Sequence, residues 1–188
     1  ASAPDSVPLS ITGDIDIQVQ VSVPTWTPPA NRVFCAKYNT PGQYSFIFRV
    51  GVAGVLNLVI SNDGTATLVS SSSTVAVSSA VNAYGWVRVT RRASDGETKF
   101  YTSADGSTWV QLGTTVAGAS GTIFNGTDAL EIGARNGGGT EPMLGAIGRV
   151  RLLNGYDGAG TLVFDANFAT AAKLAPSFTE SSSNAATV

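Results

Sequence analysis

Histidine is absent from this chain of 188 residues, and cysteine occurs once, as Cys35. The lack of histidine excludes histidine-based catalytic triads, histidine general bases and histidine metal ligands. A single cysteine cannot form a disulfide within the chain. Cys35 lies in the apolar run Val-Phe-Cys-Ala at residues 33–36, so we expect a buried and unreactive thiol rather than a nucleophile.

Charge is also scarce, since charged residues make up 13% of the chain and the net charge is −2. Without a basic excess to hold a phosphate backbone, nucleic acid is not an expected partner. The apolar runs are only a few residues long, which predicts no membrane insertion. Hydrophobic residues nevertheless reach 43%, enough for a folded core.

The length fits one domain over residues 1–188. The chain begins at Ala1 without a methionine and without a signal-peptide pattern. We therefore expect a processed protein or a segment of a longer one.

Apolar and polar residues alternate through most of the chain. The first such segment predicts a strand with Ile15, Ile17, Val19 and Val21 in the core and with Asp16, Gln18 and Gln20 facing solvent. About eleven segments of this kind are separated by turn residues every eight to twelve positions. This spacing predicts an all-β fold, an antiparallel two-sheet β-sandwich of the jelly-roll type. A short stretch at 169–174 is the one candidate for a helix.

Four stretches, taken together, form a wider pattern. They are Ala-Pro-Asp-Ser at 3–6 leading into 11–17, Gly-Trp-Val-Arg-Val-Thr at 85–90, residues 101–109, and Leu-Glu-Ile-Gly at 130–133 followed by 145–151. Their order and spacing resemble laminin-G-like, concanavalin A-like jelly-roll domains, and more narrowly those in minor tail and other virion proteins of phages that infect actinobacteria. The resemblance covers nearly the whole chain. It implies two antiparallel sheets packed face to face, one of them concave, and a location on the virion.

Asp14 and Asp16 are the candidates for hydrolysis of a glycosidic bond. Residues 14–17 resemble the E-x-D-x-E strand of laminarinase-type glycoside hydrolases, in which two carboxyl groups about 5.5 Å apart act as nucleophile and acid. Neither flanking glutamate is present, because Gly13 precedes the stretch and Gln18 follows it. We therefore predict that the chain is not an enzyme and has no catalytic residues. Arginines 149 and 151 could pair with these aspartates if their strands are neighbours.

Five residues are predicted to bind a ligand: Trp86, Arg88, Arg49, Arg135 and Asn136. An aromatic ring can stack on the apolar face of a sugar while guanidinium groups bind hydroxyl or acidic groups. Alternation places the first three on outward faces of their strands, so they could form one site if these strands share a sheet. The last two lie in a polar, glycine-rich loop at 135–141 that could close one end of it.

Three functions remain open, because this fold hosts lectins, hydrolases and structural modules. The first is a non-enzymatic, tail-associated virion module that binds a host cell-surface glycan. The second is a structural capsid or tail decoration protein whose partners are other virion proteins, and the third is a glycoside hydrolase. No cofactor is expected; calcium held by Asp63, Asp128 or Asp157 is an alternative, although no run of ligand residues is present. A homo-oligomer is compatible with the sequence.

Overall fold

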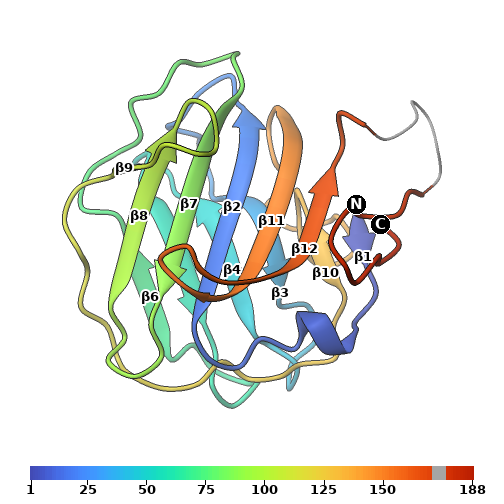
Figure 1. The fold of residues 1–188 in the computed structure, drawn as a ribbon. Coiled ribbons are helices and arrows are strands. Elements are labelled where there is room, and N and C mark those ends of the chain that lie inside the picture. The colour runs from blue at the N-terminus through green and yellow to red at the C-terminus, as the bar shows by residue number, and fades with distance from the viewer. Residues whose placement is uncertain (171–176) are drawn as a thin grey trace.

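The computed structural model describes residues 1–170 and 177–188. These residues form two six-stranded antiparallel sheets stacked face to face (Figure 1). The predicted fold class, an all-β jelly-roll sandwich, is confirmed. The described residues also contain one turn of 3₁₀ helix, η1 (Val7–Leu9). The helix predicted at 169–174 lies mostly outside the described residues, and its first two positions belong to a turn.

The strands are named in chain order and divide evenly between the sheets. Sheet A contains, from edge to edge, β1 (Ser2–Ala3), β10 (Leu130–Ile132), β3 (Arg32–Lys37), β4 (Phe46–Val50), β5 (Leu56–Ile60) and β6 (Val69–Ser72). Sheet B contains β12 (Ala159–Asn167), β11 (Ala146–Tyr156), β2 (Ile15–Ser22), β7 (Gly85–Arg91), β8 (Thr98–Ser103) and β9 (Val110–Gln111). Strands distant in sequence are thus neighbours, as with β10 and β3.

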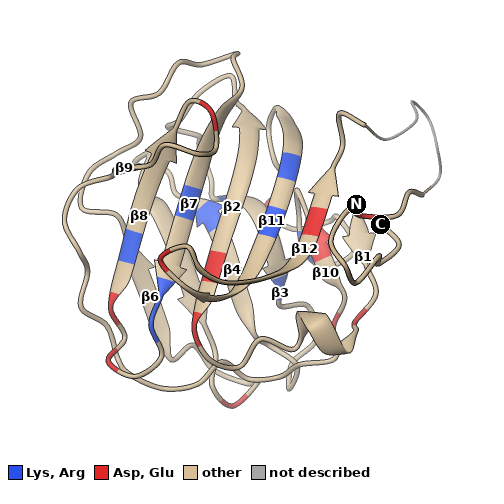
Figure 2. Cartoon of the chain, in the orientation of Figure 1, with Lys and Arg blue, Asp and Glu red and all other residues tan. Residues whose placement is uncertain are grey.

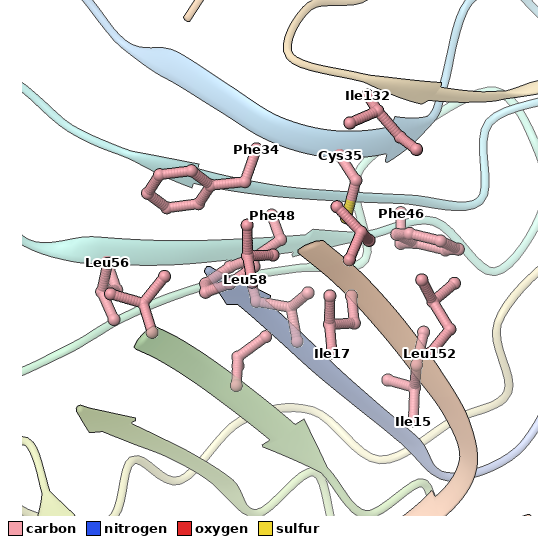
Figure 3. Packing of buried hydrophobic residues seen from close by; sticks show 14 of the residues in the cluster. Ile15, Ile17, Phe34, Cys35, Phe46, Phe48, Leu56, Leu58, Ile132 and Leu152 are labelled. Carbon is pink, nitrogen blue, oxygen red and sulfur yellow. The ribbon is translucent and has the colours of Figure 1, made fainter. Parts of the chain in front are cut away.

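The core lies between the sheets and follows the predicted alternation. The four aliphatic residues predicted to be buried on β2 are 0% exposed. They face aromatic and aliphatic side chains of sheet A, such as Phe46, Phe48 and Leu58 (Figure 3). Burying one side chain of this size stabilises a fold by about 1.5–3 kcal/mol, and a one-residue register shift would expose all four. Cys35 is fully buried in the same core, and burial raises the pKa of its thiol far above the usual range.

The outer face of β2 differs from the prediction, because its polar side chains are covered. Asp16 is 0% exposed and Gln18 is also buried. The turn between β11 and β12 folds across the lower ends of β2 and β7 (Figure 1), where the Gly158 N–H donates to Asp16 Oδ2 at 2.9 Å. Alternation assigned these side chains to the correct side of their own sheet. It could not show that a distant hairpin would cover that side.

No helix within residues 1–170 and 177–188 is long and apolar enough to cross a membrane.

Candidate functional site

The five residues predicted to form one binding site are divided between the two outer faces of the sandwich. Trp86 and Arg88 lie on β7 in sheet B, whereas Arg49 lies on β4 in sheet A. The condition for a single site, that these strands share a sheet, is therefore not met. The alternation of apolar and polar residues predicts which face of a strand is buried, but it does not predict which sheet the strand joins. Arg135 lies near Arg49, so the structure joins these two residues and separates them from the β7 pair.

On sheet B, Arg88 is committed to contacts within the protein. Its Nε lies 2.9 and 3.1 Å from the two oxygens of Asp16, and its Nη2 lies 2.5 Å from Oδ2. The side chains of Arg88 and Asp16 are 5% and 0% exposed, and Asp157 lies 3.6 Å from the same guanidinium. Figure 2 shows a blue band on β7 next to the strand β2 with its red band, and blue bands on β11 next to the strand β12 with its red band. Arg88 is thus a buried partner of two carboxylates.

Trp86 is covered by its neighbours on the same face. The guanidinium of Arg151 stacks 4.9 Å above its ring, and Trp109 meets it edge-on at 6.3 Å. The turn before Trp109 also presses on the indole, since a Cβ at Gly106 would lie 2.5 Å from the ring. Trp86 is 5% exposed as a consequence. The prediction that Trp86 and Arg88 are presented to a ligand is therefore wrong, because both side chains point outward but are packed over.

The aspartates considered for hydrolysis have separate structural partners. Asp14 Oδ1 accepts the backbone N–H of Ala93 at 2.7 Å, whereas Asp16 pairs with Arg88. β11 lies beside β2, which is the condition under which its two arginines could pair with these aspartates. The arginines point toward β12 instead, where Arg149 bonds Asp165 at 2.5 Å. The two aspartates do not work as a pair.

Sheet A carries a small hollow on its outer face, and its floor follows from strand register. Ile47 of β4 pairs with Val59 of β5, which pairs with Ser70 of β6, so their side chains lie side by side. Both aliphatic residues are buried although they point away from the main core. The hollow has a volume of about 240 Å³ and is lined by Tyr38, Ile47, Arg49, Val59, Thr67, Ser70 and Arg135. We call it the sheet A groove.

One wall of the sheet A groove is aromatic. Tyr38 follows β3 and stacks flat on Tyr44, with ring centroids 3.9 Å apart and an interplanar angle of 2°. Its hydroxyl lies 3.3 Å from Thr67 Oγ1. Because Ala36 pairs with Ile47, the register places Tyr38 and Arg49 on opposite sides of the Ile47 row. The apolar floor therefore lies between a ring and a guanidinium.

The cationic side of the groove is organised by Glu141. Its Oε1 accepts from Arg49 Nη1 at 2.9 Å and its Oε2 from Arg135 Nε at 3.1 Å. Burial raises the pKa of Glu141, but hydrogen bonds from Arg135 and Asn31 and the charges of both arginines outweigh this and leave the pKa below its usual range. One ionised carboxylate thus stands between two guanidinium groups, which leaves a net charge of +1.

The two arginines retain donors for a ligand. Their side chains are 19% and 22% exposed. Arg49 uses its Nε to bond Asn57, but its Nη2 and both terminal nitrogens of Arg135 donate to no group within residues 1–170 and 177–188. A guanidinium has five N–H donors in a planar fork that matches a carboxylate. The groove can therefore bind oxygen atoms through unused N–H groups.

Asn136 lies at the tip of the loop, outside the lining of the groove. It adopts a left-handed conformation with φ of +55°, and its backbone N–H donates to Asn39 at 2.7 Å. Its side chain is bonded to Thr140 within the same loop. The geometry gives Asn136 a role in shaping the loop that carries Arg135.

Sequence reasoning missed the tyrosine wall and the role of Glu141. A signal for the former existed, because Tyr38 and Tyr44 flank the Thr-Pro-Gly turn at 40–42 and a hairpin brings its ends together. Glu141 had no comparable signal. Its contact with Arg49 depends on the pairing of β10 with β3, which joins distant segments.

The aspartates proposed for calcium do not come together. The described part of the chain contains no group of three or more acidic, cysteine or histidine side chains that could hold a metal ion. Asp128 accepts backbone N–H groups of Asn39 and Thr40, and Asp63 accepts those of its own turn. Asp157 bonds Tyr101 and Lys99 instead.

No protein-family model matches the chain, and no curated protein matches its sequence. Solved structures match in fold. A Bacteroides ovatus protein provisionally described as carbohydrate-binding aligns with 99% of this chain at 13% identity and a TM-score of 0.65, and the chain spans 56% of that protein.

Two further structures show the same fold. The CBM40 domain of the Ruminococcus gnavus IT-sialidase, bound to α2,3-sialyllactose, aligns over 84% of this chain and 87% of its own at 16% identity and a TM-score of 0.55. Domains LG4-5 of the mouse laminin α1 chain align over 81% of this chain and 38% of theirs at 12% identity and a TM-score of 0.54. The laminin-G-like resemblance is thereby confirmed at the level of fold.

Proposed function

We propose that this protein is a non-enzymatic glycan-binding module whose site is the sheet A groove. The observation that carries the proposal is the pair of guanidinium groups, bridged by a single carboxylate, beside an apolar floor with an aromatic wall. Sugars present C–H groups on one face and hydroxyls around the rim, so they suit an apolar floor with convergent donors. The carbohydrate-binding descriptions of the Bacteroides and Ruminococcus structures support this choice.

The positive charge of the groove favours an acidic sugar over a neutral one as the ligand. Arg49 and Arg135 outnumber Glu141, and their unused N–H groups favour a carboxylate over a neutral hydroxyl. The Ruminococcus module is described as bound to sialyllactose, which is a carboxylated sugar, and this supports the choice. We propose a sugar unit bearing a carboxylate as the ligand.

The biological setting that we propose rests on the sequence. The four stretches described under the sequence analysis, which together span residues 3–151, resemble virion jelly-roll domains. We therefore propose that the module sits on a phage particle, on its tail, and binds a glycan of the host surface. A decoration module would bind other virion proteins and no sugar. Binding of the purified protein to host cell walls and to a glycan array separates these two roles.

The test of the groove compares matched arginine variants by titration calorimetry with an acidic oligosaccharide from the array. Arg49→Gln and Arg135→Gln should each weaken binding by about 10- to 100-fold, as expected for a hydrogen bond to a charged group. Arg151→Gln is the control, because Arg151 lies on the opposite sheet with a similar exposure of 24%. It should leave the affinity unchanged.

Three outcomes would overturn the proposal. The first is that the parent protein binds no glycan. The second is that Arg151→Gln weakens binding while Arg49→Gln does not, which would move the site to sheet B. The third is that the protein releases reducing sugar from the bound glycan, which would make it a hydrolase.

A further inference from the structure

A second and larger hollow lies away from the sheet A groove. It has a volume of about 460 Å³, within the range typical of ligand sites. It lies at the end of the sandwich where the segment leading into β7 meets the turn between β8 and β9. Its lining residues are Ser79, Ala80, Ala83, Tyr84, Gly85, Thr102, Ser103, Ala104, Asp105, Thr108 and Val110.

The missing side chain of Gly85 makes room for this hollow. Gly85 begins β7 and alternates with Trp86, so it points toward the space between the sheets, as Val87 does. A Cβ at Gly85 would meet only the carbonyl oxygen of Ser103, at 3.9 Å, and its φ lies outside the left-handed region. Neither the backbone nor the packing requires glycine here. A larger residue would fit only by filling the hollow.

The lining combines hydroxyl groups and methyl groups. The Tyr84 ring turns away toward β11, where a Cβ at Gly148 would lie 3.1 Å from its Cε1. Neither the hydroxyl of Ser79 nor that of Thr102 has a hydrogen-bond partner in the part of the chain that the structure describes. Such hydroxyls can both donate and accept, whereas the alanine methyls offer apolar contact.

The one charged group of the lining is already satisfied. Asp105 accepts backbone N–H groups of Ser107 and Thr108 at 2.8 Å each, together with the hydroxyls of Ser103 and Thr108. The hydrogen bonds from the backbone of Thr108 and Ser107 hold the pKa of this carboxyl well below its usual range. It remains ionised as part of the turn. A ligand in this hollow would thus meet no cation and no carboxylate with free lone pairs.

We propose that this hollow is a second binding site and that it takes an uncharged sugar ring. Hydroxyl groups bind the rim of such a ring, the alanine methyls contact its C–H face, and the space beside Gly85 accommodates its edge. The site is independent of the sheet A groove, since the two share no residue and differ in charge. A glycan that alternates neutral and acidic units would find a site for each kind of unit on this module.

The experiment uses a panel of neutral sugars as probes: glucose, galactose, mannose and N-acetylglucosamine. Binding is measured by saturation-transfer NMR and by titration. Gly85→Val fills the hollow with a residue that strands favour, and it should abolish binding of the neutral probe with an unchanged melting temperature. Gly85→Ala is the matched control and should retain most of the affinity.

A second pair of variants tests the same site without a change inside the sandwich. Ser79→Ala should weaken binding of the neutral probe by about two- to tenfold, because one hydrogen bond is lost, whereas Ser79→Thr should keep the hydroxyl and most of the affinity. Arg49→Gln should leave neutral-sugar binding unchanged, so failure at one site is distinguishable from failure at the other.

The inference is overturned if no neutral sugar binds, or if binding is unchanged in both Gly85→Val and Ser79→Ala. It is also overturned by a particular result with anilinonaphthalene sulfonate, a dye whose aromatic rings bind apolar surfaces. In that result the dye binds the parent protein, does not bind Gly85→Val, and is not displaced from the parent by any of the sugars. That result would assign the hollow to an apolar ligand.

Discussion

The two outer faces of the sandwich use arginine in opposite ways. On sheet B, Arg88 lies between two carboxylates, Asp16 and Asp157, and is almost fully buried. On sheet A, Glu141 lies between two guanidinium groups, Arg49 and Arg135, which remain partly exposed. The first arrangement covers the guanidinium almost completely, whereas the second leaves partly exposed charge and N–H groups unused. Both faces carry an outward-pointing arginine, so this feature alone does not identify a candidate site. The number of carboxylates for each guanidinium distinguishes a structural ion pair from a candidate site.

The largest effect should come from breaking the buried pair on sheet B. Asp16→Ala leaves the guanidinium of Arg88 covered by the β11–β12 turn with one weaker partner at 3.6 Å. Removal of one member of a buried ion pair typically costs about 3–5 kcal/mol. We expect a loss of this size in the free energy of unfolding, measured with urea.

An exposed pair provides the matched control for Asp16→Ala. Arg92 and Asp95 lie 2.6 Å apart with side chains that are 36% and 49% exposed. Because solvent screens such a pair, Asp95→Ala should cost much less. Equal losses in the two variants would show that Arg88 regains water once Asp16 is removed, and the contrast between the faces would then fail.

A smaller effect is expected at the groove, where Glu141 bridges the two arginines. Glu141→Gln removes a charged acceptor and should lower the free energy of unfolding by about 1–2 kcal/mol at neutral pH. Because the pKa of Glu141 is lowered in the folded protein, its contribution is complete above the unfolded pKa of about 4.3 and is lost as the pH falls through the lower folded pKa.

The pH dependence of Glu141 is measured as the difference in unfolding free energy between parent and Glu141→Gln. Other carboxylates with lowered pKa values, such as those of Asp63 and Asp95 at about 2, cancel in this difference. The stabilities of the two proteins should converge as the pH falls from the unfolded pKa through the lower folded pKa of Glu141. A gap that stays constant down to pH 2 would contradict the structural account.

The smallest effect is expected at Asn136, which sequence reasoning placed in the binding site. Asn136→Gly suits the left-handed backbone at this position, so stability should change by less than about 0.5 kcal/mol. Affinity for the acidic glycan should also be unchanged, since the side chain bonds Thr140 within the loop. A clear loss of affinity on titration would restore Asn136 to the list of ligand contacts.

Alternation was a reliable guide to the side chains that enter the core. It worked for β2 because the face toward sheet A is dry along the whole strand, so Ile15 and Ile17 could have only one orientation. It failed for Asp16, since burial there comes from the turn that contains Gly158, which is distant in sequence.

Sequence reasoning identified some residues of the candidate site but not how they come together. Arg49 and Arg135 were identified by residue type and by position on an outward face or polar loop. Their meeting at Glu141 depends on β10 pairing with β3, and β3 with β4. Nothing local in the chain encodes these contacts. The exclusion of Trp86 depends on Arg151 and Gly106, whose approach also follows from tertiary packing.

Cys35, the one thiol of the chain, can also report on motion of the sandwich. It is fully buried on β3 between the sheets, so a thiol reagent can reach it only when the sheets separate or the protein unfolds. The rate of modification under native conditions therefore measures how often the core opens. Surface variants that leave the core closed will not change this rate, and a cysteine introduced at an exposed position can be labelled first and selectively.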